Sequence, residues 1–277
     1  MEKSSKITTV STWSILGLLI FLTYVPFVLM IFISFRNNGQ IFTNFWSLPD
    51  PWIWSNYSNV YKEISRNIFN SVIVSSISTI GIVFLSSLSG YVFGRLRFPG
   101  KEGIYYLILS LMMVPGILTI IPLFIQVTGY HLDNTWFALI LPWVAGGQVF
   151  GIILCRTFIA SLPNELFECA RMDGASEFTS YFRIAMPLIV PVLITLAVIS
   201  IVGNYNDFIW PLLVINNDEK QMVTVVLNSI GQKSGLSVTQ YGLRMAGYVL
   251  SSLPLLVLFS FGMKYYISGV TSGAVKG

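Results

Sequence analysis

Charged residues are scarce in this sequence. Only 10% of the 277 residues are Asp, Glu, Lys or Arg, whereas 54% are hydrophobic. Soluble domains usually carry about a quarter charged residues, so this chain has too few charges to cover a water-facing surface of its size. The shortage excludes an ordinary soluble globular protein.

Histidine and cysteine are almost missing as well. The chain has one histidine, His131, and two cysteines, Cys155 and Cys169. A single histidine cannot support the histidine-dependent triads and dyads of nucleophilic catalysis, and neither cysteine has a second metal ligand at a useful spacing. We therefore expect no catalytic site and no metal site, and we interpret His131 as a solvated loop residue.

The phosphate-binding motif of ATPases is also missing. No stretch matches G-x-x-x-x-G-K-[ST], whose backbone amides and lysine hold the phosphates of ATP. We therefore expect the chain to bind no ATP, no Mg²⁺ and no other cofactor itself.

The apolar residues gather in six long blocks that contain no Asp, Glu, Lys or Arg. A helix of about 20 apolar residues crosses the hydrocarbon core of a bilayer, and lipid offers no hydrogen-bond partner to a non-helical backbone. The sequence therefore predicts an all-α integral membrane protein that is a single transmembrane domain, residues 1–277. The predicted transmembrane helices are residues 12–35, 70–94, 103–127, 135–154, 184–204 and 245–263.

Lysine and arginine are distributed unevenly between these blocks. With a cytoplasmic N-terminus, ten of the 16 Lys and Arg residues lie in inner segments and six in outer segments. Because positive residues concentrate in cytoplasmic loops, both termini are predicted to be cytoplasmic. The net charge of +4 then reflects this bias rather than a nucleic-acid-binding surface. Both cysteines fall on the cytoplasmic side, where thiols stay reduced.

The blocks themselves hold no titratable acid or base. Ionisable residues inside the membrane mark proton relays and voltage sensors, so a proton-coupled pump and a voltage-gated channel are disfavoured. A self-contained secondary transporter that is coupled to sodium through backbone carbonyl groups stays open as an alternative. Otherwise the energy for transport must enter through another protein.

The inner connection at residues 156–183 is the most informative segment. Ser161 is expected to cap a helix whose first turn contains Pro163. Gly174 is expected to end that helix, and Ser176 to cap a second short helix. The sequence therefore predicts a helix–Gly–helix element that projects into the cytoplasm.

An apolar stripe is predicted on the first of these helices. Leu162, Leu166, Cys169 and Ala170 recur at helical spacing. Such a stripe in the cytoplasm implies either a docking partner or packing against the helix ends of the same chain. The residues alone leave both possibilities open.

Amides and aromatic residues meet at the outer end of the fifth block. Asn204, Tyr205 and Asn206 are neighbours there, and Phe208 and Trp210 follow. Aromatic faces beside amide groups suit sugar rings, which have apolar faces and hydroxyl edges. The alternative is an aromatic belt at the membrane interface.

The inner connection and the start of the fifth block resemble the EAA motif of binding-protein-dependent ABC importer permeases. The first alanine of that motif is replaced by Cys169, and NYNDF at residues 204–208 is similar to the W-N-D-F of the carbohydrate branch. The chain ending SGVTSGAVKG also resembles the ending of MalG-like subunits in that branch. The matching positions are Glu168, Ala170, Asp173, Gly174, Ala175, Ile184, Pro187, Leu188 and Pro191.

The resemblance implies the fold of a type I ABC importer permease in the bacterial cytoplasmic membrane. It also implies an ATP-driven importer of sugars, including oligosaccharides, in which this chain forms half of the pathway and is not itself an enzyme. Its implied partners are a second, MalF-like permease, two copies of a cytoplasmic ATPase that bind ATP and Mg²⁺, and an extracytoplasmic sugar-binding protein.

The same resemblance implies roles for particular residues. The helix–Gly–helix element would be the coupling helix that seats in the ATPase, and the outer loop at residues 216–240 would contact the binding protein. The residues expected to couple to the ATPase are Glu165, Glu168, Ala170, Asp173, Gly174 and Ala175. The C-terminal residues expected to reach the ATPase are Gly273, Ala274, Val275, Lys276 and Gly277. The candidates for lining the sugar pathway are Asn204, Tyr205 and Asn206.

Overall fold

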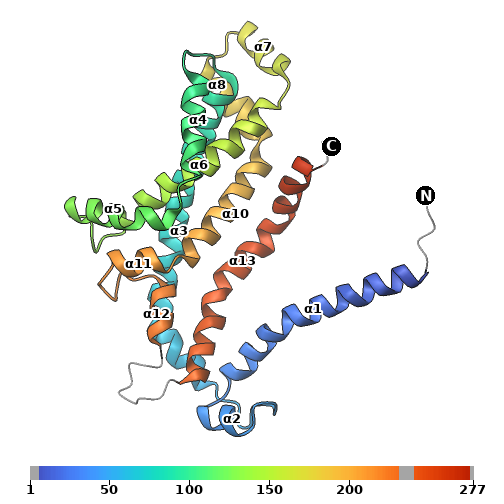
Figure 1. Ribbon diagram of the computed structural model, residues 1–277, viewed down its shortest axis with the longest axis vertical. Coiled ribbons are helices and arrows are strands. Elements are labelled where there is room, and N and C mark those ends of the chain that lie inside the picture. Colours follow the sequence, from blue (N-terminus) through green and yellow to red (C-terminus); the bar gives the residue numbers. More distant parts are fainter. Residues whose placement is uncertain (1–5, 231–239, 275–277) are drawn as a thin grey trace. The chain divides into compact units, whose positions relative to one another are not determined.

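The computed structural model describes the backbone of residues 6–230 and 240–274, and the side chains of residues 11–230 and 240–262 (Figure 1). Within these ranges the chain forms helices joined by turns and contains no strand. Four helices are long and apolar enough to cross a membrane. They lie in α1 (Lys6–Ser34), α3 (Ser55–Arg95), α6 (Phe137–Ala160) and α13 (Tyr241–Ala274).

The second of these helices begins earlier than the apolar block indicated. Helix α3 starts at Ser55 rather than at residue 70. Residues 55–69 are polar on average, which hides them from a search for apolar blocks, but Val60 and Ile64 are fully buried one helical turn apart. The short helix α2 (Asn38–Thr43) precedes α3.

The third predicted span, residues 103–127, is not one straight helix. The chain forms α4 (Lys101–Leu111) and α5 (Gly116–Gly129), which meet at an angle of 97°. Pro115 lies at the break in an extended conformation. Proline has no N–H to continue the helix and disfavours a helical conformation in the residue before it, so the continuous-span prediction is wrong here.

The fifth predicted span, residues 184–204, is broken in the same way. The helical segment Glu177–Leu188 and helix α10 (Val190–Asn206) meet at an angle of 75° at Ile189. The first segment comprises α8 (Glu177–Ser180), the π-helix η1 (Tyr181–Ala185) and α9 (Met186–Leu188). If each bent pair is one span, the described residues form up to six spans. Helices α7 (Asn164–Met172), α11 (Ile209–Val214) and α12 (Val223–Ser229) are too short to cross.

The contacts divide the chain into two compact units. One contains Met1–Ser65 and Val226–Leu253, and the other contains Arg66–Val225 and Pro254–Gly277. Each unit is described separately below. The interpretation of the whole chain as a single domain stays a prediction.

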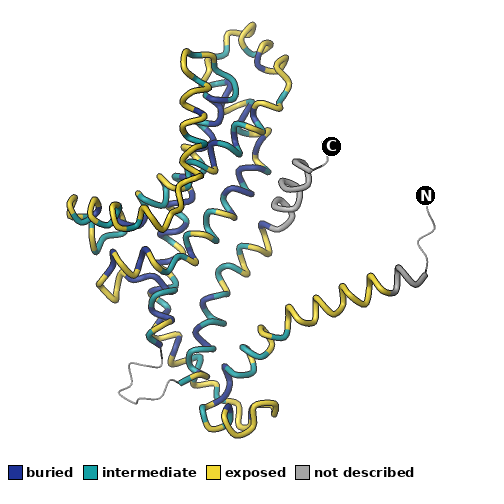
Figure 2. Tube along the Cα trace, viewed as in Figure 1, coloured by how far each residue is buried: buried dark blue, intermediate teal, exposed yellow. Residues whose placement is uncertain are grey.

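In the first unit, the described contacts centre on the end of α1. The ring of Phe35 packs against those of Trp52, Trp54 and Tyr57, with centroids between 4.7 and 5.0 Å apart. The buried guanidinium of Arg36 donates hydrogen bonds to two backbone carbonyl groups of the loop after α2. Most of the described part of α1 before this point is exposed, as its yellow trace in Figure 2 shows, which fits a helix whose apolar surface faces lipid or another protein.

In the second unit, α3 and α6 pack very closely. A Cβ atom at Gly90 would lie 2.4 Å from the Cβ atom of Cys155, and one at Gly151 would lie 2.1 Å from Oγ of Ser86. Gly147 and Gly151 form a G-x-x-x-G pair on α6. Small residues at such positions let membrane helices approach and gain van der Waals contact, so the side chains on α3 are held in a fixed register against α6.

A buried core fills the inner half of this unit. It is made by side chains from α3, α6, α7, η1 and α10, together with the residue at the bend before α10. The short helix α7 therefore joins a core that is otherwise built from the long helices. Its buried members are Ile82, Tyr91, Cys155, Ile159, Phe167, Tyr181, Ala185, Ile189, Val192, Leu193 and Leu196.

Candidate functional site

Helix α7 is attached to the end of α3 through Arg95. The Arg95 guanidinium donates to the carbonyl oxygen of Ile159 at 2.6 Å and to that of Leu162, both at the end of α6. It also donates to Oδ1 of Asn164, the first residue of α7, and lies 4.2 Å from the ring centroid of Phe167. One cation therefore satisfies carbonyl groups that the end of a helix leaves without partners, and it fixes where α7 begins.

Ser161 does not cap the N-terminus of α7, so that prediction is wrong. Ser161 closes α6 instead, because its Oγ donates to the carbonyl oxygen of Phe158 at 2.8 Å. The residue before the first turn of α7 is Pro163, which offers no side-chain cap. Oδ1 of Asn164 instead accepts a hydrogen bond from the Arg95 guanidinium, which anchors the first residue of α7 without capping its N–H groups.

Helix α7 ends at a left-handed glycine, as the sequence predicted. Gly174 has φ +79°, its N–H donates to the carbonyl oxygen of Arg171 at 3.0 Å, and the N–H of Ala175 donates to that of Ala170 at 2.9 Å. This pair of bonds is the Schellman motif. A Cβ atom at Gly174 would meet nothing within 4 Å, so glycine is needed there for its backbone conformation and not for space.

The second short helix, α8, begins as predicted at Ser176. Oγ of Ser176 accepts a hydrogen bond from the N–H of Thr179 at 3.2 Å. Oε2 of Glu177 accepts one from the Tyr91 hydroxyl at 2.6 Å, and its Oε1 lies 3.4 Å from Nε of Arg171. Glu177 thus connects the two short helices to each other and to α3.

The two faces of α7 have different environments. Phe167 is buried against the core, whereas Leu166 and Cys169 are exposed. Of the predicted apolar stripe, Leu166 and Cys169 are therefore exposed and Ala170 is half-buried, whereas Leu162 precedes the helix and packs against the core. One face of α7 packs on the same chain, and the other carries uncovered apolar groups, so docking of a partner there stays a prediction.

The exposed apolar side chains of this element form what we call the outer face. Met172 is 81% exposed and Phe178 is 70% exposed, one on each side of the Gly174 turn. Glu165, Glu168, Asp173 and Gly174 are exposed too, while Ala170 and Ala175 are half-buried. The outer face consists of Leu166, Cys169, Met172, Phe178 and Phe182.

A charged cleft of about 670 Å³ lies beside α7. It separates the end of α3 from α7 and α8, and Glu168 is the one predicted coupling residue in its lining. The lining residues are Arg95, Leu96, Arg97, Asn164, Phe167, Glu168, Arg171 and Glu177.

The family to which this chain belongs is shown by its sequence. Residues 83–272 match the family described as binding-protein-dependent transport system inner membrane component. The chain is a member of that family. It is an inner-membrane permease, which confirms the resemblance found at residues 168–191 and the predicted location in a bacterial inner membrane.

Two relatives illustrate the match. The permease is 33% identical over 268 residues to the probable ABC transporter permease protein YurM of Bacillus subtilis (strain 168), covering 96% of this chain and 88% of YurM. It is also 33% identical over 233 residues to the arabinooligosaccharides transport system permease protein AraQ of the same organism, covering 82% of this chain and 81% of AraQ.

The fold of the permease matches a solved importer. The crystal structure of a bacterial ABC transporter involved in the import of the acidic polysaccharide alginate contains a chain similar to it at a TM-score of 0.81 and 19% identity, over 96% of this chain and 99% of that one. A bacterial alginate ABC transporter in complex with an alginate pentasaccharide-bound periplasmic protein matches at 0.62 and 18%, over 92% of each chain. The predicted all-α importer permease fold is therefore confirmed.

The three pathway candidates of the permease have different environments. Tyr205 is buried and lines an apolar groove of about 480 Å³ between α3, α10 and α13. Asn206 is exposed and donates to the carbonyl oxygen of Val202 in its own helix. Nδ2 of Asn204 is buried and has no hydrogen-bond partner among the described residues. Trp210, in contrast, is a core residue whose Nε1 donates to a backbone carbonyl group of α6.

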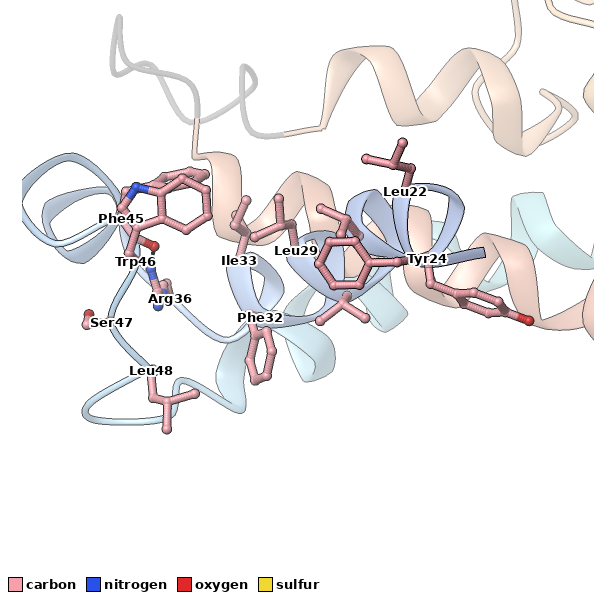
Figure 3. A pocket seen from close by; sticks show the side chains of 13 residues that line it. Leu22, Tyr24, Leu29, Phe32, Ile33, Arg36, Phe45, Trp46, Ser47 and Leu48 are labelled. Atoms are coloured by element: carbon pink, nitrogen blue, oxygen red, sulfur yellow. Dashed lines mark hydrogen bonds between the residues drawn. The ribbon is translucent and has the colours of Figure 1, made fainter. Parts of the chain in front are cut away.

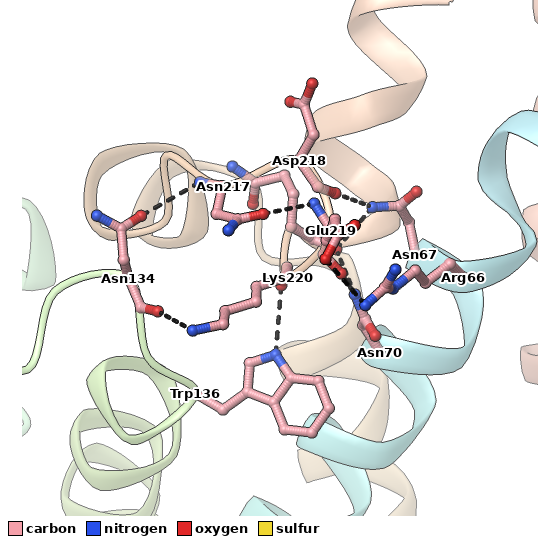
Figure 4. A network of polar contacts seen from close by, with 10 residues as sticks. Arg66, Asn67, Asn70, Asn134, Trp136, Asn217, Asp218, Glu219 and Lys220 are labelled. Atoms are coloured by element: carbon pink, nitrogen blue, oxygen red, sulfur yellow. Dashed lines mark hydrogen bonds and ion pairs between the residues drawn. The ribbon is translucent and has the colours of Figure 1, made fainter.

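A network of polar contacts that the sequence did not reveal holds the turn between α11 and α12 (Figure 4). Nδ2 of Asn67 donates to the carbonyl oxygens of Asp218 and Gln221, each at 3.0 Å. Nδ2 of Asn70 donates to those of Glu219 and Gln221, at 2.8 and 3.2 Å. The only sequence signal was two amides three positions apart on one helix face. The network gives the outer side of the second unit a fixed turn.

Asn134 holds the same turn from the loop before α6. Its backbone has φ +57°, and its Oδ1 accepts hydrogen bonds from the N–H groups of Asn216 and Asn217. Asparagine tolerates this left-handed conformation better than most residues. Nζ of Lys220 donates back to the carbonyl oxygen of Asn134 at 3.0 Å.

An apolar groove of about 550 Å³ lies in the first unit (Figure 3). It is lined by the second half of α1 and by the loop after α2, including Phe45, Trp46 and Leu48. Trp46 is 84% exposed. Phe45 and Trp46 belong to the loop that joins α2 to α3.

Most of the C-terminal residues that are predicted to reach the ATPase lie outside the described residues. Gly273 and Ala274 form the end of α13, and the structure describes only their backbone. Val275, Lys276 and Gly277 lie outside the described ranges, as do residues 231–239 of the predicted binding-protein loop.

Proposed function

We propose that this permease imports oligosaccharides as one of two permease subunits of an ATP-driven transporter. Two comparisons support a sugar: AraQ is named for arabinooligosaccharides, and the transporters with a similar fold are described as handling alginate. The NYNDF stretch at residues 204–208 resembles the carbohydrate branch as well. The buried, unpartnered amide of Asn204 adds physical support, because such a group gains from a hydroxyl partner.

The helix–Gly–helix element is proposed to receive a separate ATPase. The observation that carries this step is the outer face, on which large apolar side chains stay exposed although the opposite face of α7 is packed. Exposed apolar patches on a fixed element mark interaction sites. The coupling residues are Glu165, Glu168, Ala170, Asp173, Gly174 and Ala175, and the C-terminal residues 273–277 form a second contact.

The permease is proposed to do no chemistry itself. A second permease would complete the pathway, two ATPase subunits would bind ATP and Mg²⁺ and hydrolyse the nucleotide, and an extracytoplasmic binding protein would deliver the sugar. One alginate structure is described as a complex with a periplasmic protein, which supports the last partner. Asn204, Tyr205 and Asn206 would lie along the sugar pathway.

The proposal is tested on the complex purified from membranes of the host bacterium through a tag on this chain. A co-purifying subunit should be photolabelled by 8-azido-ATP, whereas this chain should not be. In proteoliposomes, ATP hydrolysis should rise when the binding protein is added together with an arabino-oligosaccharide, malto-oligosaccharide or alginate oligosaccharide. Uptake that is driven by an ion gradient without ATP would contradict the proposal and favour a secondary transporter.

A further inference from the structure

Three side chains on one face of α3 contact the cytoplasmic element. Ser87, Tyr91 and Arg95 lie four residues apart, so they point the same way along the helix. Oγ of Ser87 and the hydroxyl of Tyr181 in η1 are 2.7 Å apart. Tyr91 donates to Glu177 in α8, and Arg95 holds the first residue of α7. Each segment of the element therefore has its own contact with α3.

The Glu177 contact also spans the turn between the two short helices. Arg171 lies in the last turn of α7 and Glu177 in the first turn of α8, with Gly174 between them. The Arg171–Glu177 pair thus fixes the angle at the turn, and the Tyr91 hydroxyl ties that pair to α3. The ring of Tyr91 packs against those of Phe167 and Tyr181, at centroid distances of 6.2 and 5.5 Å.

The connections of α7 to the rest of the chain are otherwise short, non-helical segments. Residues 161–163 precede α7 and residues 173–176 follow it. Helix α3, in contrast, is a single helix of 41 residues that packs closely against α6 at Gly90. The side-chain contacts with α3 therefore give a displacement of α7 a direct route to a membrane helix, in addition to the chain itself.

We propose that Tyr91, Glu177 and Arg171 form the link that passes a displacement of α7 to α3. They are positioning residues: they touch neither the sugar nor ATP, and they make α3 follow the element on which the ATPase acts. This inference rests on the proposed function. Arg95 holds the beginning of α7 in place, so the Tyr91–Glu177–Arg171 contacts carry the motion at its end.

The test measures uptake per ATP hydrolysed in proteoliposomes that contain the complete complex. Tyr91→Phe removes the hydroxyl and keeps the packed ring, and Glu177→Gln removes the charge that faces Arg171. Tyr106→Phe is the matched control, because Tyr106 is 64% exposed on α4 and its ring also packs beside another tyrosine. A hydrogen bond to a charged group is strong enough to change such a ratio by about fivefold when it is lost.

We expect Tyr91→Phe and Glu177→Gln to hydrolyse ATP in response to the loaded binding protein while sugar uptake per ATP falls about fivefold. The double variant should be no worse than either single variant, since the residues act as one unit. Tyr106→Phe should leave the ratio unchanged.

Two results would overturn the inference and leave the proposed function intact: an unchanged ratio in Tyr91→Phe, or loss of assembly by that variant, which would make the hydroxyl a purely structural group. If the wild-type complex shows no stimulated hydrolysis, the proposed function itself fails, and the inference fails with it.

Discussion

The two ends of α3 in the second unit hold their neighbouring segments in different ways. At the outer end, the buried amides of Asn67 and Asn70 donate to backbone carbonyl groups of the turn at residues 218–221. At the inner end, Tyr91 holds the charged side chain of Glu177, which is about half exposed and pairs with Arg171.

This difference separates a fixed contact from an adjustable one. Neutral amides that are buried against carbonyl groups have no alternative partner, so breaking them leaves polar groups without hydrogen bonds. A half-exposed ion pair can exchange its partner for water at little cost. The outer end therefore suits a static platform, and the inner end suits a link that moves together with α7 and can form again after α7 is displaced.

The contrast between the two ends of α3 holds only if the helix is rigid between them. Gly90→Ala would place a methyl group 2.4 Å from Cβ of Cys155, so we expect it to destabilise the permease by about 2–3 kcal/mol. Unfolding in mixed detergent micelles, followed by tryptophan fluorescence, measures this. The control is Gly203→Ala in α10, where a Cβ atom meets nothing within 4 Å. Equal losses in both variants would show that close packing with α6 does not matter.

Removing the hydrogen bonds of Asn70 at the outer end should lower the free energy of unfolding. Asn70→Ala leaves the carbonyl groups of Glu219 and Gln221 without this donor, and we expect a loss of about 1–2 kcal/mol in the same unfolding measurement. Asn206→Ala serves as the comparison, because that amide is exposed and bonds only within its own helix. If both asparagine variants unfold alike, the outer turn is not held as described.

Alanine variants at Gly174 and Gly100 distinguish the effect of backbone strain on stability from a role in coupling to the ATPase. Both have left-handed φ angles, +79° and +77°, and both have open space around a Cβ atom. Alanine at either position should cost about 1 kcal/mol of stability. Only Gly174→Ala should also lower ATP hydrolysis that is stimulated by the loaded binding protein, because only Gly174 joins α7 to α8. Equal activity of the two variants would remove Gly174 from the coupling element.

Added salt should raise hydrogen exchange slightly at the inner end of α3 and leave it unchanged at the outer end. Raising NaCl from about 0.05 to about 0.5 M screens the half-exposed Arg171–Glu177 pair but not the buried amides of Asn67 and Asn70. We expect hydrogen exchange of α7 amides to rise about twofold, with no change at residues 218–221. A larger change at the outer turn would reverse the assignment of the fixed and adjustable ends.

The sequence predicted the features that obey local rules. The Gly174 turn and the Ser176 cap depend on residues within six positions of each other, and the apolar blocks locate the long helices because lipid requires them. The bend before α5 also had a local signal, since Pro115 and Gly116 interrupt that block. The prediction missed it because block length alone was used.

The contacts that explain the two ends of α3 could not be found in this way. Tyr91 and Glu177 are 86 residues apart, and Asn70 and Gln221 are 151 residues apart. The predicted start of α7 at Ser161 was also wrong, because Ser161 closes α6 and Arg95 from α3 holds the first residue of α7. Pairings between distant helices determine these details, and a single sequence contains no local signal for them.

The central claim is that a separate ATPase docks on the outer face. Cys169 is exposed there and Cys155 is buried, so a bifunctional photo-crosslinker with one thiol-reactive arm is attached to Cys169 in membranes stripped of the ATPase, and the complex is then reassembled. The account predicts a crosslinked product that contains this chain and the subunit labelled by 8-azido-ATP. Reaction of Cys169 only with a membrane-impermeant reagent added from outside intact cells, or failure to capture that subunit in a complex that still hydrolyses ATP, would contradict it.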